Sequence, residues 1–195
     1  MTIKTQKITE LRQRTGAGIM DIKKALTEAK GDEDKAIEIL RKQGQKAAAK
    51  KQARETKEGL VRAYVHNTGK VGALVEVLCE TDFVARNEEF KDLCNDLAMQ
   101  IVATDPLYLK SSDVPAEVVT KEKDIQREAL LAEGKPSELV EKILAGKMDK
   151  YFEEVCLLNQ PFIKDEEKTI QDLITEKTAK LGEKIEIRRF QRFQI

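Results

Sequence analysis

Few side chains in this chain of 195 residues have the types and spacing that enzyme chemistry requires. The single histidine is His66, so any nucleophilic triad would have to include that residue. Its neighbours Val65 and Asn67 indicate instead a strand that runs into a turn. The sequence contains neither a glycine-rich phosphate loop nor a cluster of metal-ligand residues. We therefore predict that the protein is not an enzyme and that it holds no cofactor and no metal.

The three cysteines, Cys79, Cys94 and Cys156, have neither metal-binding nor redox spacing. We interpret them as small buried hydrophobic residues of a protein in a reducing compartment. No apolar run approaches the roughly 20 residues that span a bilayer, and the start of the sequence is unlike a signal or transit peptide. Lys plus Arg and Asp plus Glu number 35 each, so the chain lacks the charge excess of nucleic-acid-binding proteins. We expect a soluble, cytoplasmic protein with no membrane partner and no direct nucleic-acid partner.

The loop of residues 80–86 has the strongest features of a protein-binding site. It connects a predicted strand to a helix that Asn87 can cap, so it lies at the surface between two rigid elements. Phe83 has two interpretations. It folds back as a hydrophobic staple over Phe90 or Leu93 at the start of the helix, or it enters a pocket of a partner together with Asp82. The residues alone favour the staple and leave the second interpretation open.

Residues 1–43 have the pattern of a compact module of three short helices. Apolar residues recur at three- and four-residue steps between Ile19 and Ala29, which is typical of an amphipathic helix. Gly16 and Gly31 mark the corners, and Asp32 can cap the third helix. This pattern predicts a bundle like that of ubiquitin-associated domains, which generally bind proteins.

Residues 44–58 differ in composition, since alanine and long charged residues favour a helix without giving it an apolar face. We interpret this segment as an exposed basic helical linker. Its basic residues Lys50, Lys51 and Arg54 leave open a contact with RNA or with an acidic partner.

Residues 59–195 are predicted to form an α+β core domain. Alternating apolar residues at 60–65 and 71–78 flank the turn sequence Asn67-Thr68-Gly69-Lys70, which indicates a β-hairpin. Residues 170–174 indicate a brief helix. The alternating segment 185–188 is expected to return as a strand to the same sheet. Pro115 and Pro136 each open a predicted helix, and together they indicate a helical insertion at about residues 115–153. The expected fold class is thus α+β, with a helical bundle followed by a small antiparallel sheet packed with helices.

Two long ungapped segments closely resemble signatures of the elongation factor Ts family. They are residues 11–26 (LRQRTGAGIMDIKKAL) and residues 80–87 (ETDFVARN). Shorter segments at 160–162 and 185–189 also resemble parts of this family, so the resemblance covers nearly the whole chain. It is closest to short family members with a single core subdomain.

The resemblance implies that the protein binds the GTPase elongation factor Tu in its GDP-bound state and speeds the release of GDP during polypeptide elongation. It implies that the N-terminal module docks on the nucleotide domain of the GTPase through Arg12, Ile19, Met20 and Lys23. It also implies that a wedge dislodges the Mg²⁺ beside the nucleotide, and that this wedge is formed by Thr81, Asp82, Phe83 and Val84. Ile19 stands where some relatives have methionine, but the two side chains are close in volume.

Short family members of this kind resemble the members that pair into homodimers. Longer members carry two related core subdomains, and pairing of two single-core chains would restore a surface with two lobes. We therefore expect a homodimer, with its contact either at the edge of the sheet or along the helices of residues 115–153.

Two other functions stay open. One is an RNA-binding accessory protein of translation that uses residues 41–57, with an affinity that falls steeply with salt. The other is an adaptor of the ubiquitin-associated type without exchange activity.

Overall fold

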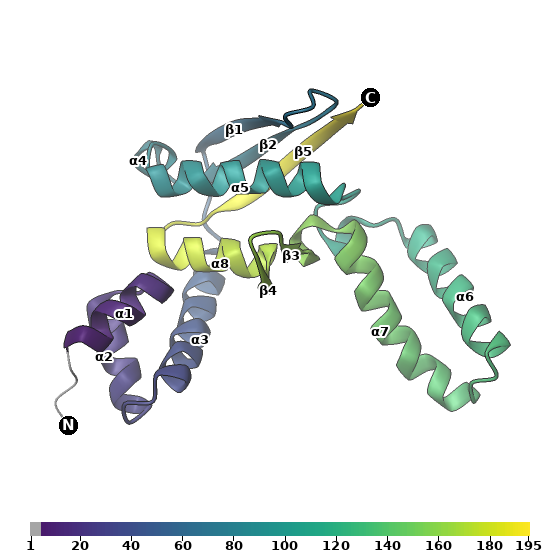
Figure 1. The fold of residues 1–195 in the computed structure, drawn as a ribbon, viewed down its shortest axis with the longest axis horizontal. Coiled ribbons are helices and arrows are strands. Elements are labelled where there is room, and N and C mark those ends of the chain that lie inside the picture. The colour runs from purple at the N-terminus through teal and green to yellow at the C-terminus, as the bar shows by residue number, and fades with distance from the viewer. Residues whose placement is uncertain (1–4) are drawn as a thin grey trace. The chain divides into compact units, whose positions relative to one another are not determined.

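The computed structural model describes residues 5–195 and has the predicted α+β class (Figure 1). The first four residues of the predicted bundle lie outside this range. The chain divides into two compact units. The first consists of Met1–Val61, Glu76–Cys94 and Asp172–Arg188, and the second consists of Arg62–Val75, Asn95–Gln171 and Arg189–Ile195. The predicted domain boundaries at residues 43 and 58 stay predictions.

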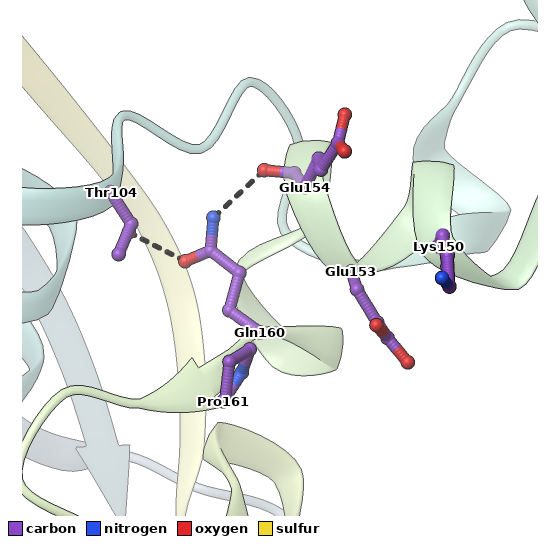
Figure 2. A pocket seen from close by; sticks show the side chains of 6 residues that line it. All are labelled: Thr104, Lys150, Glu153, Glu154, Gln160 and Pro161. Carbon is purple, nitrogen blue, oxygen red and sulfur yellow. Dashed lines mark hydrogen bonds between the residues drawn. The ribbon is translucent and has the colours of Figure 1, made fainter. Parts of the chain in front are cut away.

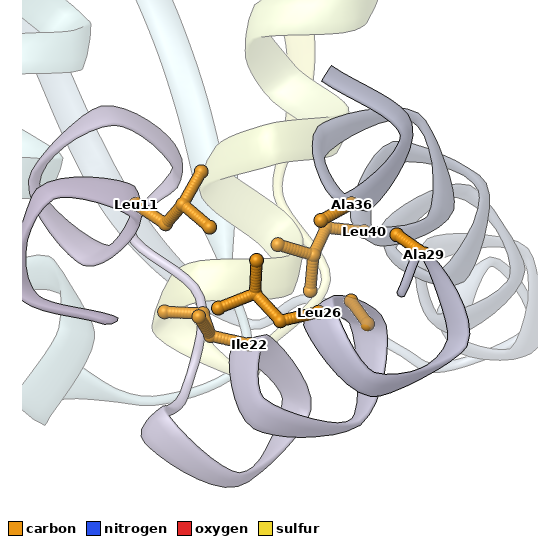
Figure 3. Packing of buried hydrophobic residues seen from close by; sticks show 7 residues of the cluster. Leu11, Ile22, Leu26, Ala29, Ala36 and Leu40 are labelled. Carbon is orange, nitrogen blue, oxygen red and sulfur yellow. The ribbon is translucent and has the colours of Figure 1, made fainter. Parts of the chain in front are cut away.

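Three helices form the N-terminal bundle: α1 (Thr5–Thr15), α2 (Ile19–Glu28) and α3 (Glu33–Lys51). Gly31, with φ at +88°, ends the turn after α2, and its N–H donates to the carbonyl of Leu26. The Asp32 carboxylate caps α3 by accepting from the Lys35 N–H at 3.1 Å, as predicted. Figure 3 shows the core of the bundle, which consists of Leu11, Ile22, Ala25, Leu26, Ala29, Ala36 and Leu40.

The third helix is longer than the predicted module. It continues through the alanine-rich segment to Lys51, because these residues have high helix propensity and nothing in them ends the helix. The expected helical linker is therefore helical only in its first half, and the chain leaves the helix before the first strand starts at Glu58.

The main sheet has three strands in the order β1 (Glu58–Val65), β2 (Val71–Cys79) and β5 (Glu186–Gln194). The predicted hairpin is confirmed, since the His66 N–H donates to the Val71 carbonyl across a turn in which Gly69 has φ at +68°. The predicted return of the last strand to this sheet is also confirmed.

Helix α5 (Glu88–Thr104) follows the sheet hairpin, and the short helix α4 (Asp82–Ala85) lies between them. The Asn87 side chain accepts from the Glu89 N–H at 2.8 Å, so the predicted cap is present. Strand β2 and helix α5 each present one buried face. The buried side chains are Ala73, Val75, Val77 and Cys79 on the strand, and Phe90, Leu93, Cys94, Leu97, Ala98 and Ile101 on the helix.

Residues 116–155 form an antiparallel pair of helices in the second unit (Figure 1). Helices α6 (Ala116–Ala132) and α7 (Ser137–Val155) pack around their own cluster of Leu130, Val140, Leu144 and Met148. The short 3₁₀ helix η1 (Ser111–Asp113) precedes them. None of the helices in the described part of the chain has the length and hydropathy of a membrane span.

Between α7 and the last strand, the chain forms the 3₁₀ helix η2 (Leu157–Asn159) and the small antiparallel pair β3 (Pro161–Phe162) and β4 (Asp165–Thr169). Helix α8 (Ile170–Leu181) follows. The sequence indicated a helix only for residues 170–174. The structure extends it to Leu181 because Ile170, Leu173 and Ile174 are buried on one face and Thr178 continues that face one turn later.

Candidate partner-binding site

The segment expected to be a loop between β2 and α5 contains one turn of helix, α4. The N–H groups of Ala85 and Arg86 donate to the carbonyls of Thr81 and Asp82 at 3.2 and 3.0 Å. An acidic residue at the start of a helix is stabilised by the helix dipole, and the Asp82 carboxylate also pairs with Arg86 at 3.1 Å, four residues later. Ala85 is buried and fixes the turn to the rest of the unit. We call Thr81–Val84 the tip.

Phe83 projects into solvent, with 83% of the side chain exposed. The interpretation of Phe83 as a staple over the start of α5 is therefore wrong. In a helix, each residue is rotated by about 100° from the last. Because Ala85 is the buried position of α4, Phe83 lies two residues earlier on the opposite side. The aromatic ring is presented outward from a fixed turn of helix.

Two carboxylates hold the base of the tip. Glu183 accepts three hydrogen bonds, from the N–H of Glu80 at 3.1 Å, from the N–H of Thr81 at 3.0 Å and from the Thr81 hydroxyl at 2.6 Å. Glu80 accepts in turn from the Lys184 N–H at 2.6 Å and pairs with Arg54 at 3.3 Å. The Lys184 N–H, followed by Arg54, lowers the pKa of Glu80 below its usual range. We call the hydrogen bonds among Glu80, Thr81, Glu183 and Lys184 the carboxylate clasp.

The clasp could not be predicted from the sequence. Glu183 follows Thr81 by 102 residues, and it lies in the turn between α8 and β5. No local pattern marks one glutamate among so many charged residues. The only signal available was the predicted return of the last strand to the sheet, which brings the turn before it to the end of the hairpin.

Cys79 lies directly below the tip and is fully buried. Its thiol donates to the carbonyl of Thr81 at 3.2 Å. Burial, followed by the negative charge of Glu183, raises the pKa of Cys79 to about 11. At neutral pH this cysteine is a thiol and not a thiolate, so it acts as a packing residue and has little nucleophilic reactivity.

The four N-terminal residues implied by the resemblance lie on α1 and at the start of α2. Ile19 and Met20 are 51% and 64% exposed, and Arg12 and Lys23 are exposed as well. The buried side chain of Ile22 fixes this part of α2 to the bundle core. The result is an apolar pair with two basic neighbours, which suits a partner surface that is apolar with acidic groups around it. These residues and the tip belong to the same compact unit.

A family model described as Elongation factor TS matches residues 4–195. The chain belongs to the elongation factor Ts family. Elongation factor Ts of Moorella thermoacetica is 58% identical over 188 residues, which cover 96% of this chain and 93% of that relative. The relative from Carboxydothermus hydrogenoformans is 56% identical over 193 residues, covering 99% and 89%. That from Thermodesulfovibrio yellowstonii is 54% identical over 195 residues, covering 100% and 97%.

In this member of the elongation factor Ts family, an open depression in the second unit is a weaker candidate site (Figure 2). Its most buried polar side chain is Gln160, and both ends of that amide already have partners in the protein. The amide oxygen accepts from the Thr104 hydroxyl at 2.6 Å, and the amide nitrogen donates to the Glu154 carbonyl at 2.9 Å. The charged side chains of the lining, Lys150, Glu153 and Glu154, are exposed and carry charges of both signs. The depression therefore offers no ligand a specific set of polar groups.

The basic segment near the end of α3 is partly used within the chain. The Lys51 ammonium donates to the carbonyl of Thr178 on α8 at 3.3 Å, and Arg54 pairs with Glu80. Two of the three basic residues that suggested RNA binding therefore have intramolecular partners. Their contacts support a structural role for the segment.

Proposed function

We propose that the protein is a guanine nucleotide exchange factor that binds the GDP-bound GTPase elongation factor Tu in the cytoplasm and promotes release of GDP. Membership in the elongation factor Ts family supports this role. The observation that carries the proposal is the tip, where Phe83 is 83% exposed on a turn of helix whose base is hydrogen-bonded to Glu183. An exposed aromatic side chain on a rigid base is typical of a residue that binds a pocket of a partner.

The proposed mechanism is mechanical and electrostatic. Phe83 enters the nucleotide domain of the GTPase, and the tip displaces the Mg²⁺ that bridges the β-phosphate to that domain. Loss of Mg²⁺ leaves the phosphate charge uncompensated and weakens the binding of GDP. Because linkage is reciprocal, nucleotide must weaken the binding of the exchange factor by the same factor. No covalent intermediate is needed.

The N-terminal bundle is proposed to act as a docking module of the ubiquitin-associated type. Ile19 and Met20 would supply apolar contact area, and Arg12 and Lys23 would pair with acidic groups of the nucleotide domain. Docking through a second site raises the effective concentration of the tip at the nucleotide site.

Release of fluorescent GDP from elongation factor Tu, followed by stopped flow, tests this function. Wild-type protein is expected to accelerate release by orders of magnitude. For the double variant Asp82→Ala with Phe83→Ala, the limiting rate of GDP release is expected to fall by about 10- to 100-fold or more. A displaced or missing anchor group commonly has an effect of this size.

The matched control is Leu107→Ala, which truncates a side chain that is 67% exposed in the second unit. It should exchange as fast as wild type. Absence of any acceleration by wild-type protein would rule out the exchange function. Equal rates for wild type and the double variant would leave the function standing but would remove the role of the tip.

We also propose that two copies of the chain pair through the outer face of the sheet. Arg62 and Arg192 contact groups on α5, at Asn95 and Val102 respectively, so they mark the inner face. Strand alternation then places neighbouring side chains on the outer face. The exposed apolar residues there are Val65 at 63%, Leu74 at 44% and Phe193 at 63%. A second copy suits this face because the chain has no net charge and two copies do not repel each other.

A further inference from the structure

We propose that Glu183 is a positioning residue for nucleotide exchange, and that Thr81 serves to anchor the tip to Glu183 and does not contact the partner. This inference rests on the proposed function of the tip. It assigns different roles to residues that the family resemblance treats as one wedge.

The first support is the number of hydrogen bonds that end on one side chain. Glu183 accepts from two consecutive backbone N–H groups, at Glu80 and Thr81, and from the Thr81 hydroxyl, over distances of 2.6–3.1 Å. Hydrogen bonds to an ionised carboxylate are about twice as strong as those between neutral groups. Two adjacent N–H groups fixed on the same oxygen leave the backbone at the base of the tip little freedom to rotate.

The second support is that the contact is reciprocal. Glu80, on the tip side, accepts from the N–H of Lys184, and Glu183, on the other side, accepts from the tip. The two segments extend from neighbouring strands of one sheet, since β5 is hydrogen-bonded beside β2. Each carboxylate therefore accepts a hydrogen bond from the backbone of the other segment, so neither segment can move without breaking hydrogen bonds to both carboxylates.

The Thr81 side chain shows the division of roles. Thr81 occupies the position before α4 where a hydroxyl commonly caps a helix, yet it makes no cap hydrogen bond. Its hydroxyl donates to Glu183 instead. This polar group is therefore already used inside the protein, whereas Phe83, two residues later, is exposed for a partner.

The third support is that Glu183 itself is held in place. Gly182 ends α8 with φ at +79°, and its N–H donates to the carbonyl of Thr178 at 3.1 Å. Helix α8 is fixed to the start of α5 by the pair of Lys180 with Glu89 at 2.5 Å. The carboxylate thus projects from a turn with a fixed backbone.

Pre-organisation of this kind predicts a specific kinetic effect. If the clasp positions the tip, its loss should lower the limiting rate of GDP release at saturating exchange factor and should change the half-saturating concentration little, because the docking residues on α1 and α2 are untouched. For Glu183→Ala we expect a fall of roughly 10- to 100-fold in the limiting rate. For Thr81→Val, which loses one hydrogen bond and keeps its shape, we expect a fall of about three- to tenfold.

Rescue distinguishes positioning from a general structural role. In Glu183→Gln the amide oxygen can accept the two N–H groups and the amide nitrogen can donate to Thr81, so this variant should stay within about threefold of wild type. The control Glu166→Ala removes an exposed carboxylate of β4 and should leave the rate unchanged. Glu183→Ala added to Phe83→Ala should cause no further loss, because Glu183 acts through the tip.

Amide hydrogen exchange of Glu80 and Thr81, measured by NMR without elongation factor Tu, tests the clasp separately from the function. Both amides should exchange slowly in wild type and faster in Glu183→Ala, while amides of the bundle core stay protected. Equal rates of amide hydrogen exchange in both proteins would overturn the proposal even if the wild-type protein accelerates nucleotide exchange. The proposal would also be overturned if adding Glu183→Ala to Phe83→Ala lowered the rate as much as Glu183→Ala lowers it in the wild type. A rate for Glu183→Gln as low as that for Glu183→Ala would overturn it as well. If the wild-type protein does not accelerate release of GDP from elongation factor Tu, the proposed function fails. The amide data alone then decide whether the clasp holds the tip.

Discussion

Asp82 and Phe83 are neighbours on the tip, yet they are held differently. Asp82 pairs with Arg86 at 3.1 Å, and the side chains are 45% and 81% exposed. Such an exposed ion pair contributes only about 0.2–1 kcal/mol, so a group on a partner can replace Arg86 at small cost. The Phe83 ring projects into solvent and gains apolar contact only when a partner covers it. Both side chains are thus available for binding. Binding then requires that the backbone that carries them is fixed.

The chemistry of Cys79 gives a test at this scale. With a pKa of about 11, only about one thiol in a thousand is a thiolate at pH 8, so iodoacetamide should leave Cys79 of the native protein unmodified. Glu183→Ala removes a negative charge that raises this pKa and frees the tip above the thiol. We expect Cys79 to be alkylated severalfold faster in this variant, as measured by peptide mass spectrometry.

Cys94 on α5 and Cys156 after α7 are internal controls, since both are buried cysteines outside disulfides. Their alkylation should be equally slow in both proteins. Rapid modification of Cys79 in the wild type would contradict the structure around the tip.

At the scale of elements, the sequence predicted what depends on near neighbours. The caps at Asp32 and Asn87 and the turn at Gly69 follow from local chemistry and were predicted correctly. Helix α8 was predicted too short, and β3 and β4 were not predicted. Two residues of β3 and the charged sequence of β4 carry no strand pattern. They are held by Gln100 on α5, whose amide donates to the Pro161 carbonyl and accepts from the Ile163 N–H.

The same limit applies to the candidate site. Periodicity placed the tip between a strand and a helix but could not set the direction of Phe83, because that direction depends on which residue of α4 is buried. It could not find Glu183, because the contact is made across 102 residues. Contacts of this range depend on the tertiary fold and not on local propensity.

Two glycines in different backbone settings lead to opposite predictions for stability. Gly16 follows α1 with φ at +66°, and an added Cβ would lie 2.6 Å from the Lys180 side chain of α8. Gly16→Ala should lower stability by about 1–2 kcal/mol, which corresponds to roughly 2–8 °C in the midpoint of thermal unfolding. Gly146 lies inside α7 with no atom near its Cβ position, so Gly146→Ala should raise stability by about 0.5–1 kcal/mol. Differential scanning calorimetry measures both, and shifts of the same sign would contradict this account of the two positions.

At the scale of the whole molecule, the residues proposed to contact the GTPase gather in one of the two compact units. This unit is assembled from three separate parts of the chain, and α8 connects them. Its Asp172 pairs with Arg41 of the bundle at 3.1 Å, and its Lys180 pairs with Glu89 at the start of α5. The proposed docking residues and the tip are therefore parts of one packed body.

The proposed pairing of two copies is also a property of the whole molecule. Light scattering should give twice the mass of the chain for wild type, and Leu74→Asp with Phe193→Asp should give a single chain, because each copy would have to bury two unpaired carboxyl groups in the contact. Leu139→Asp on α7, where the side chain is 47% exposed, should remain a dimer. A monomeric wild type would remove the proposal, and dissociation by Leu139→Asp alone would move the contact to the helices of residues 115–153.

The separation of the tip from Glu183 has a consequence during synthesis. A chain growing on the ribosome from its N-terminus completes the bundle sequence and adds Thr81 102 residues before the glutamate that holds the tip. Until α8 and the turn after it emerge, the nascent chain has the proposed docking residues but lacks the hydrogen bonds that fix the tip. Under the proposed function, competence for exchange is gained only after Glu183 has been added, so a shorter nascent chain would occupy its target without acting on it.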